Sequence, residues 1–226
     1  MEKILITGAS SGIGRAVATK LATRGLSLAL NARSAAALEP LAGLKFPGDL
    51  THASTAETVV NGAAEALGGL DAVIHCAGVG LIKSTLETTD ADFTRVMNIN
   101  TRATFLVARE ACRVMAPAKR GLFITIPGIL GRAPMRNAAA YCASKYAVTG
   151  LIKCLSQEFQ RSGIRFSLLH LGGVDTPFWN DIGMSVQRDK MIPVETAADL
   201  VIQALDAPPH LVLSEIVMQP ESHQLI

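Results

Sequence analysis

Two side chains that together could move a proton, Tyr141 and Lys145, stand four residues apart in the segment Tyr-Cys-Ala-Ser-Lys. On a helix this spacing places both on the same face. A nearby cation favours the charged form of a phenol and lowers its pKa. Two charges about 4 Å apart at an effective dielectric of about 20 attract by roughly 4 kcal/mol, which allows a shift of up to about three pKa units. The pair therefore predicts a general acid-base, with an ordinary pair on a solvated helix face as the alternative.

The N-terminal residues predict a second element of chemistry, a glycine turn. Residues 3–7 are apolar enough for a short buried strand, and Gly8, Gly12 and Gly14 follow at once. After the glycines, apolar residues recur at helical spacing, namely Ile13, Val17 and Leu21. A strand, a glycine turn and a helix allow the backbone to approach a pyrophosphate, which the free N–H groups of the helix end attract. The alternative is a glycine-rich turn without a ligand, and the position of the motif between strand and helix argues against it.

The rest of the chain predicts one α/β domain that would position these residues. Strand-like segments at residues 3–7, 27–31, 44–46, 72–75, 122–126, 165–170 and 215–219 alternate with helical patterns. Gly25 is expected to end the first helix in a left-handed conformation, and Thr89 or Asp90 to begin a long helix toward Met115. Parallel strands of this kind present their carboxyl ends at one edge of the sheet, where ligands bind. All the motifs fall at that edge.

Composition excludes several classes of function. The 226 residues, 49% hydrophobic and 18% charged, suffice for one large core, with no linker or repeat. A net charge of +2 and no run of Lys or Arg argue against nucleic acid or an anionic membrane as a partner. No apolar stretch reaches the roughly 18 residues of a membrane span. The four scattered cysteines fit reduced thiols in a cytoplasmic protein, with no metal site expected.

Together, Thr7-Gly8-x-x-x-Gly12-x-Gly14 and Tyr141-x-x-x-Lys145 resemble the motifs of the short-chain dehydrogenase/reductase family over essentially the whole chain. Further agreement lies in the short motifs that follow later strands, namely Asp49, Ala77-Gly78, Asn98-Ile99-Asn100 and Gly172-x-Val174-x-Thr176. The resemblance implies a single doubly wound Rossmann domain over residues 1–226. Its parallel seven-stranded sheet would carry helices on both faces.

By this resemblance the catalytic residues are Tyr141, Lys145 and Asn100. Tyr141 would exchange a proton with a carbonyl or alcohol oxygen, and Lys145 would hold the nicotinamide ribose and lower the pKa of the phenol. Asn100 would position a water that relays protons to Lys145. Helical spacing places Asn100 on an inward face, so a core asparagine with satisfied hydrogen bonds is the alternative.

The same resemblance implies a dinucleotide site at the sheet edge. Its expected cofactor-binding residues are Gly8, Ser10, Ser11, Gly12, Ile13, Gly14, Asn31, Arg33, Asp49, Leu50, Cys76, Ala77, Gly78, Tyr141, Lys145, Val174 and Thr176.

Cofactor choice depends on the end of the second strand. A carboxylate there would bind the ribose 2′-hydroxyl of NAD, but this chain has Asn31-Ala32-Arg33-Ser34. A guanidinium can hold a 2′-phosphate, so NADP(H) is the predicted cofactor. Ser11 stands where many NADP-preferring relatives carry a basic residue, and a solvated Arg33 is the alternative.

Three positions depart from the family pattern. Cys76 replaces an asparagine that often braces the central strands, and Leu171 replaces a proline before Gly172. Gly128 stands where relatives carry a catalytic serine, 13 residues before the tyrosine. Losing a donor of this kind costs about a hundredfold to a thousandfold in rate in other enzymes. Thr125 is expected to point to the other face of its strand, which leaves the Gly128 N–H or a trapped water as the substitute.

Substrate choice is expected to lie in a flap near residues 177–193. Its large apolar residues are Phe178, Trp179, Ile182, Met184 and Met191. They predict an apolar wall, or else they pack the flap onto the core. Arg188 and Lys190 are expected either in solvent or against an acidic group of the substrate.

The sequence thus predicts an NADP(H)-dependent oxidoreductase that transfers hydride between nicotinamide and a carbonyl or secondary alcohol. The substrate would be small and largely apolar, as for a general carbonyl reductase or a 3-oxoacyl-ACP reductase. The alternative is a dinucleotide-binding protein with little catalysis, because a serine is missing at Gly128. By analogy, residues 92–115 and 137–162 would pair copies into a homodimer or homotetramer.

Overall fold

The computed structural model describes residues 1–222, 224 and 225. Seven parallel strands form the main sheet in the order β3-β2-β1-β4-β5-β6-β9. The strands are β1 (Lys3–Thr7), β2 (Ser27–Asn31), β3 (Leu44–Lys45), β4 (Ala72–His75), β5 (Gly121–Thr125), β6 (Ile164–Leu171) and β9 (Glu215–Met218). The predicted doubly wound sheet is therefore confirmed, with strand ends moved by one residue at several places.

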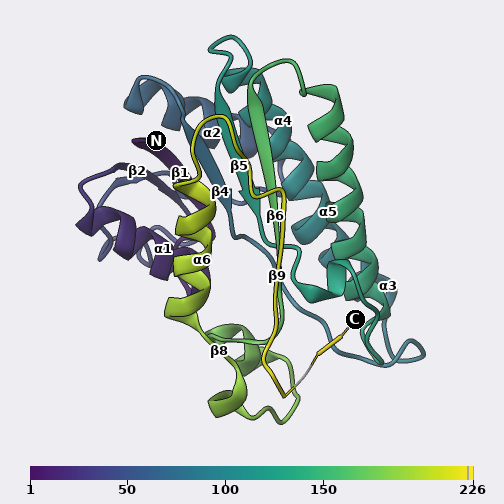
Figure 1. The fold of residues 1–226 in the computed structure, drawn as a ribbon. Helices are drawn as coiled ribbons and strands as arrows, with labels where there is room; N and C mark the ends of the chain where they lie inside the picture. Colours follow the sequence, from purple (N-terminus) through teal and green to yellow (C-terminus); the bar gives the residue numbers. More distant parts are fainter. Residues whose placement is uncertain (223, 226) are drawn as a thin grey trace.

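Helices cover both faces of this sheet (Figure 1). The α-helices are α1 (Gly12–Thr23), α2 (Ala53–Leu67), α3 (Asp90–Val96), α4 (Ala103–Met115), α5 (Ala139–Glu158) and α6 (Val194–Leu205). Ile4 and Ile6 of β1 pack into the layer that contains α1 and α6, and Leu5 packs into the layer of α2, α4 and α5. Successive strand residues point to opposite faces, so an apolar strand fills both layers at once.

The long helix expected to start near Thr89 is divided. Thr89 caps α3 by accepting a hydrogen bond from the N–H of Asp92, whose carboxylate bonds back to the Thr89 N–H. A π-helical segment, Met97–Arg102, then separates α3 from α4. A π-helical turn rotates the following side chains relative to an α-helix. The helix therefore begins where the sequence predicts, but its register changes around Asn100.

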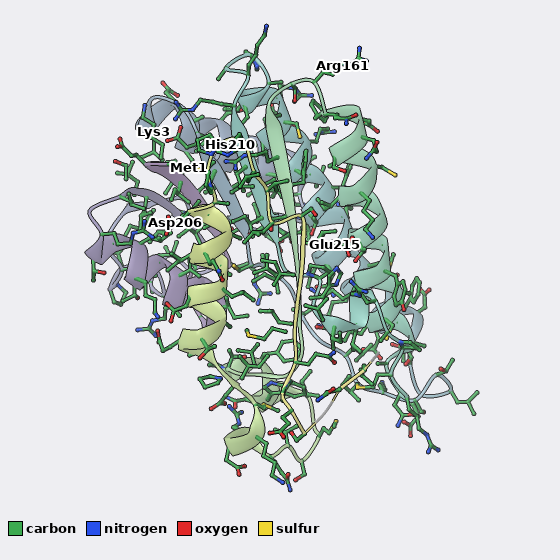
Figure 2. All side chains as sticks on the ribbon, in the orientation of Figure 1. Met1, Lys3, Arg161, Asp206, His210 and Glu215 are labelled. Atoms are coloured by element: carbon green, nitrogen blue, oxygen red, sulfur yellow. The ribbon has the colours of Figure 1, made fainter. Side chains whose placement is uncertain are left out.

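The remaining elements gather at the carboxyl edge of the sheet. They are the short strands β7 (Val174–Asp175) and β8 (Ile192–Pro193), and the 3-10 segments η2 (Ile129–Gly131), η3 (Pro177–Asp181) and η4 (Arg188–Lys190). Figure 1 shows the segment around β8 at one end of the molecule, and Figure 2 shows Lys3 and Arg161 at the opposite end. Among the described residues, no helix is long and apolar enough to span a membrane.

Candidate active site

The glycine turn after β1 is held by two close backbone approaches. Gly8 has φ +67°, and a Cβ there would lie 2.7 Å from the backbone N of Ala77. A Cβ on Gly14 would overlap the carbonyl oxygen of Gly8. Positive φ and absent space both require glycine, so these two residues fix the approach of α1 to β1 and to the residues after β4.

The start of α1 lies open beside this turn. The Ser11 side chain makes no capping hydrogen bond, so it leaves the first N–H groups of α1 open. A hollow of ≈ 310 Å³ adjoins this end, and its lining includes Ser11, Gly12, Arg15 and Thr176. Thr176 lies against Gly12, with 3.4 Å between its Cβ and an ideal Cβ on the glycine. The fold therefore brings the motif after β6 to the glycine turn, in an arrangement that suits a phosphate group.

Asn31 and Arg33 at the end of β2 have different surroundings, because the first is buried and the second is exposed. Asn31 is buried, and its amide donates to the carbonyl oxygens of Phe46 (2.9 Å) and Gly48 (3.2 Å). Arg33 is exposed, and its charge contributes to lowering the pKa of Asp49, an effect due first to hydrogen bonds from Thr51. The Asn31 side chain thus holds the loop after β3, while the Arg33 guanidinium faces solvent near the predicted ribose position.

Tyr141 and Lys145 lie on α5 with the lysine ammonium near the phenol. The Lys145 Nζ is 5.8 Å from the centre of the Tyr141 ring and donates to the carbonyl oxygen of Ile126 (3.3 Å). A Cβ on Gly78 would lie 3.3 Å from that Nζ and 3.2 Å from the Asn100 Oδ1. The residues after β4, the π-helical segment and α5 therefore meet at one point.

The expected low pKa of Tyr141 is wrong for the protein alone. Burial raises the pKa of Tyr141, and burial lowers the pKa of Lys145 to about 8. Removing both groups from water disfavours both charged forms, and this cost exceeds any mutual attraction between the two groups. Without further groups in the site, the phenol is neutral at physiological pH and the lysine is easily deprotonated.

Asn100 uses its whole side-chain amide inside the protein. Its Oδ1 accepts from the N–H of Val79 (2.8 Å), and its Nδ2 donates to the Val79 carbonyl and to the Ser144 hydroxyl, both at 2.9 Å. The side chain thus behaves as the core asparagine that was the alternative interpretation. It ties the loop after β4 to α5, directly beside Lys145. Its role in holding a water stays a prediction.

Gly128 has a backbone conformation that only glycine adopts readily, with φ 73° and ψ 176°. Its N–H donates to the Leu169 carbonyl (3.3 Å), so the expectation that this N–H replaces the serine is wrong. Its carbonyl oxygen lies 3.1 Å from the Nδ1 of His170. Because a carbonyl only accepts, this bond requires the proton on Nδ1. Thr125 donates to the His75 carbonyl (3.2 Å) and offers no substitute.

His170 is a site residue that the sequence analysis missed. It is buried, burial lowers its pKa, and its Nε2 has no hydrogen-bond partner among the described residues. The available signal was an ionisable residue within the largely apolar strand run of residues 166–171, which also contains Ser167. Its contact with Gly128 comes only from the pairing of β5 with β6.

The other predicted cofactor residues lie around the same edge. Cys76 is close to Gly14, and burial raises the pKa of its thiol to about 12, so the thiol stays neutral. Leu50 and Val174 are buried in opposite core layers, and Ile13 packs against the layer of α1. Ser10 and Ala77 are half-buried beside the turn. Within the described residues, no cluster of His, Cys, Asp or Glu could hold a metal.

The flap packs onto the site through aromatic side chains. The ring centres of Phe178 and Tyr141 are 6.1 Å apart, and Phe178 lies edge-on to Trp179 at 5.3 Å. The Trp179 indole donates to the Val174 carbonyl (2.8 Å). Phe178 and Ile182 press so closely on Gly80 that a Cβ there would overlap both. The position of Phe178 next to Tyr141 fits the apolar-wall interpretation, whereas the packing of Phe178 and Ile182 on Gly80 fits the alternative that the flap packs onto the core.

Arg188 differs from both expectations for it. Its guanidinium donates to the Asp175 carboxylate (2.9 Å), the Thr176 carbonyl (3.1 Å) and the Asn180 side chain. These bonds close the flap onto its own base, so the group is not available to an acidic substrate. Lys190 is exposed.

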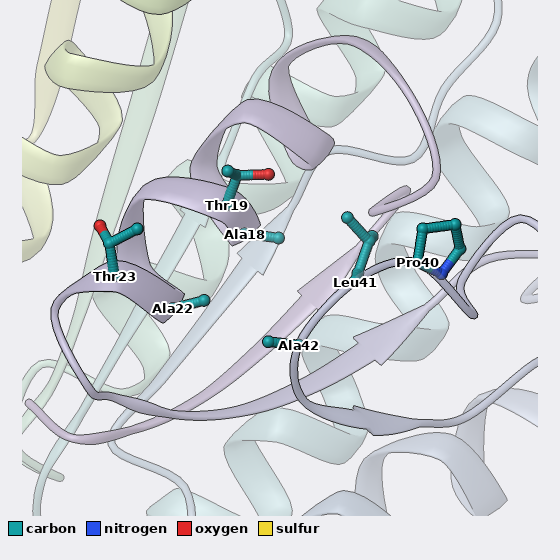
Figure 3. Close-up of a pocket in the computed structure, with 7 residues that line it drawn as sticks. All are labelled: Ala18, Thr19, Ala22, Thr23, Pro40, Leu41 and Ala42. Atoms are coloured by element: carbon teal, nitrogen blue, oxygen red, sulfur yellow. The ribbon is translucent and has the colours of Figure 1, made fainter.

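A second hollow, of ≈ 350 Å³, lies away from these residues, between α1 and the loop before β3 (Figure 3). Its lining is mainly apolar and small, namely Ala18, Thr19, Ala22, Thr23, Pro40, Leu41 and Ala42. It contains no ionisable side chain, so the chemistry belongs to the sheet edge.

Comparisons with known proteins show which family the chain belongs to. The profile of the short chain dehydrogenase family matches residues 2–186. A sepiapterin reductase from Chlorobaculum tepidum is 29% identical, over 97% of this chain and 96% of its own. A short-chain dehydrogenase/reductase from Armillaria gallica is 35% identical over 78% of this chain and 72% of its own.

Solved structures of a reductase and of a short-chain oxidoreductase are also similar to this chain. A metagenomic short-chain oxidoreductase in complex with NADP has a TM-score of 0.83 and 28% identity, with 97% of each chain covered. Levodione reductase has a TM-score of 0.89 and 25% identity, covering 98% of this chain and 97% of its own. With its glycine turn, its Tyr141–Lys145 pair and these relatives, the chain belongs to the short-chain dehydrogenase/reductase family of oxidoreductases.

Proposed function

We propose that the protein is an NADP(H)-dependent reductase of a small, largely apolar carbonyl compound, acting reversibly on the corresponding secondary alcohol. The observation that carries the proposal is the meeting of Tyr141 and Lys145 with the glycine turn at one sheet edge, beneath the apolar flap. The relatives include enzymes named as reductases of carbonyl compounds, such as sepiapterin reductase and levodione reductase.

The residues present fit a dinucleotide. The open start of α1, the tight turn at Gly8 and Gly14, and the hollow beside Thr176 suit a pyrophosphate. At the end of β2, no acidic side chain stands between Asn31 and Ser34, and the exposed Arg33 can hold a 2′-phosphate. This supports NADP(H) over NAD(H), as does the relative solved with NADP.

In this mechanism Tyr141 donates the proton that the carbonyl oxygen gains. A bound nicotinamide would supply the hydride in reduction or accept it in oxidation. In reduction the carbonyl carbon gains the hydride, the Tyr141 O–H bond breaks, and its proton goes to the carbonyl oxygen to form the alcohol. The raised pKa of Tyr141 keeps the phenol protonated before the reaction. The Lys145 ammonium then stabilises the phenolate, and a pKa of about 8 suits Lys145 to returning a proton from solvent.

A second candidate function rests on Gly128. Its N–H and its carbonyl oxygen are both bonded within the protein, so neither assists the reacting oxygen. One missing donor of this kind costs about a hundredfold to a thousandfold in rate. A dinucleotide-binding protein with little turnover is therefore the alternative, and it retains the whole glycine-turn site.

The decisive experiment measures NADPH oxidation against a panel of ketones, aldehydes and 3-oxoacyl thioesters. We expect turnover on at least one apolar ketone and an increase in melting temperature with NADPH. A rise in melting temperature without turnover on any compound would favour the binding protein. No response to NADPH or NADH at all would contradict both functions.

The quaternary state is a separate part of the proposal. Phe93, Phe105 and Tyr146 are exposed on α3, α4 and α5, the helices expected to pair. Apolar side chains at such positions support a homodimer or homotetramer, which light scattering after size-exclusion chromatography would measure. All four cysteines are free, which supports a cytoplasmic location.

A further inference from the structure

The segment that follows β9 lies across the site edge of the sheet. Met218 accepts a hydrogen bond from the N–H of Gly172 (2.8 Å) at its carbonyl oxygen, and the chain continues into Pro220. A Cβ on Gly172 would lie only 2.7 Å from the Pro220 Cδ. Figure 1 shows the chain turning from the end of β9 back toward α3 and α5. This segment is therefore seated on the sheet edge where β6 ends.

A single side-chain amide closes the segment into a loop. The Gln219 Nε2 donates to the Leu225 carbonyl (3.1 Å), and its Oε1 accepts from the Leu225 N–H (2.7 Å). The Gln219 side chain thus forms hydrogen bonds with both the N–H and the carbonyl group of Leu225. Because a primary amide offers one acceptor and two donors in fixed directions, this arrangement fixes the position of Leu225 and the direction of its side chain.

The loop places Leu225 against the same buried cluster that Tyr141 packs on. Leu225 and Tyr141 pack against the same cluster of buried side chains, together with other partly buried apolar residues. The buried members are Leu130, Ala138 and Cys142, and the partly buried ones also include Ile82, Ile129 and Met135. Tyr141 thus lies near Phe178 of the flap and shares a buried cluster with Leu225 of the segment after β9.

We propose that Leu225 is a specificity-determining residue that limits the size of the apolar group on the substrate, and that Gln219 is its positioning residue. The inference rests on the proposed function, because it assigns one wall of that same site. The substrate class is a ketone with a compact apolar substituent next to the carbonyl.

The test compares a compact and an extended aryl methyl ketone, acetophenone and 2-acetonaphthone, with Leu225→Ala and Gln219→Glu. Shortening the leucine opens room for several carbon atoms, and pocket differences of this size change specificity by about 10- to 200-fold. We expect Leu225→Ala to shift the ratio of kcat/KM at least tenfold toward the extended ketone. Gln219→Glu keeps the acceptor for the Leu225 N–H but loses the donor, so the same shift should be smaller.

Gln224→Ala is the matched control, because Gln224 lies in the same segment and, among the described residues, its side chain bonds to the Glu221 carbonyl alone (3.3 Å). The ratio of kcat/KM for the two ketones in Gln224→Ala should equal that of the wild type. An unchanged ratio in Leu225→Ala, with an unchanged melting temperature and NADPH response, would overturn the proposal.

A binding measurement separates this inference from the proposed function. Trp179 is the single tryptophan of the chain, and its ring lies edge-on to Phe178, which is next to Tyr141. Its fluorescence, titrated with each ketone on the NADP⁺-loaded protein, measures affinity without turnover. If no variant turns over any ketone, a tenfold shift in the affinity ratio still supports the wall at Leu225. Equal affinity ratios in wild type and Leu225→Ala would reject it.

Discussion

Two glycine turns at the same sheet edge differ in what their backbone groups do. The turn after β1 holds Gly8 at φ +67° and Gly12 at φ +51°, and no side chain caps the helix that follows. The turn after β5 holds Gly128 at φ +73°, yet its N–H and carbonyl are bonded to Leu169 and His170. The Ser11 side chain leaves the N–H groups that follow the first turn uncapped, whereas the second turn is hydrogen-bonded within the protein. Chemistry near the second turn must therefore come from side chains, above all Tyr141.

The largest effect should come from Tyr141→Phe, which removes the proton donor beside the second turn and leaves the first turn intact. General acid-base groups contribute about 10²- to 10⁴-fold, so kcat should fall by that factor while NADPH affinity changes little. Steady-state kinetics and NADPH titration measure both. Tyr146→Phe is the control on the same helix, since the Tyr146 hydroxyl bonds to the Arg132 carbonyl, and its kcat should stay near that of the wild type.

Gly8→Ala should break the first turn. The new Cβ meets the Ala77 backbone at 2.7 Å in a left-handed conformation. Conformational strain of about 1–2 kcal/mol adds to overpacking of about 1–3 kcal/mol. Denaturant unfolding should show this loss, and the NADPH-induced rise in melting temperature should vanish. Gly150→Ala on α5, with open space around it, should instead stabilise by about 0.5–1 kcal/mol. Unaltered NADPH binding in Gly8→Ala would reject the role of this turn.

Gly128→Ser sharpens the comparison at the second turn. Space exists for a side chain, since the nearest atom to a new Cβ is the Leu171 carbonyl oxygen at 3.5 Å. The backbone conformation nevertheless costs a side-chain residue about 1–3 kcal/mol. Serine and alanine should therefore destabilise equally, and neither should raise kcat. A higher kcat with serine alone would mean that the loop rearranges. The hydrogen bonds of residue 128 to Leu169 and His170 would then break in the active enzyme.

Arg33→Ala should have the smallest effect and concerns the first turn alone. The guanidinium is exposed, so its contact with a 2′-phosphate is partly screened by solvent. A loss of about 1.4 kcal/mol corresponds to a tenfold higher Kd for NADPH, and the Kd for NADH should not change. Arg161→Ala, at the opposite end of the molecule (Figure 2), is the charge-matched control. An equal loss for both cofactors would contradict the role of Arg33 in cofactor choice.

The sequence predicted the fold almost completely. The alternation of apolar strands and helices predicted all seven strands of the main sheet, because burial on both faces makes the central strands β1, β4 and β5 almost continuously apolar. Gly25 ends α1 with φ +74°, as expected from its local conformational preference. The interruption at Met97–Arg102 was not predicted, since a π-helical turn leaves no clear sequence pattern.

Predictions about the site succeeded where they depended on spacing and failed where they depended on surroundings. The distance of Lys145 from Tyr141 follows from four residues on one helix. The pKa of Tyr141 does not, because burial comes from packing around the phenol, to which the distant Phe178 contributes. The surroundings of Arg188 were not predictable from local spacing either, since its partners Asp175 and Thr176 lie more than ten residues away in the chain.

By itself, the sequence determined the positions of the glycines, the order of the elements and the Tyr141–Lys145 spacing, because each depends on local geometry. Only the tertiary structure decided that the Gly128 N–H is hydrogen-bonded to Leu169, that the Gly128 carbonyl is bonded to His170, and that Leu225 shares a buried cluster with Tyr141. These contacts join segments tens of residues apart. Burial and hydrogen-bond partners of this kind arise from the whole packing arrangement, which no local pattern encodes.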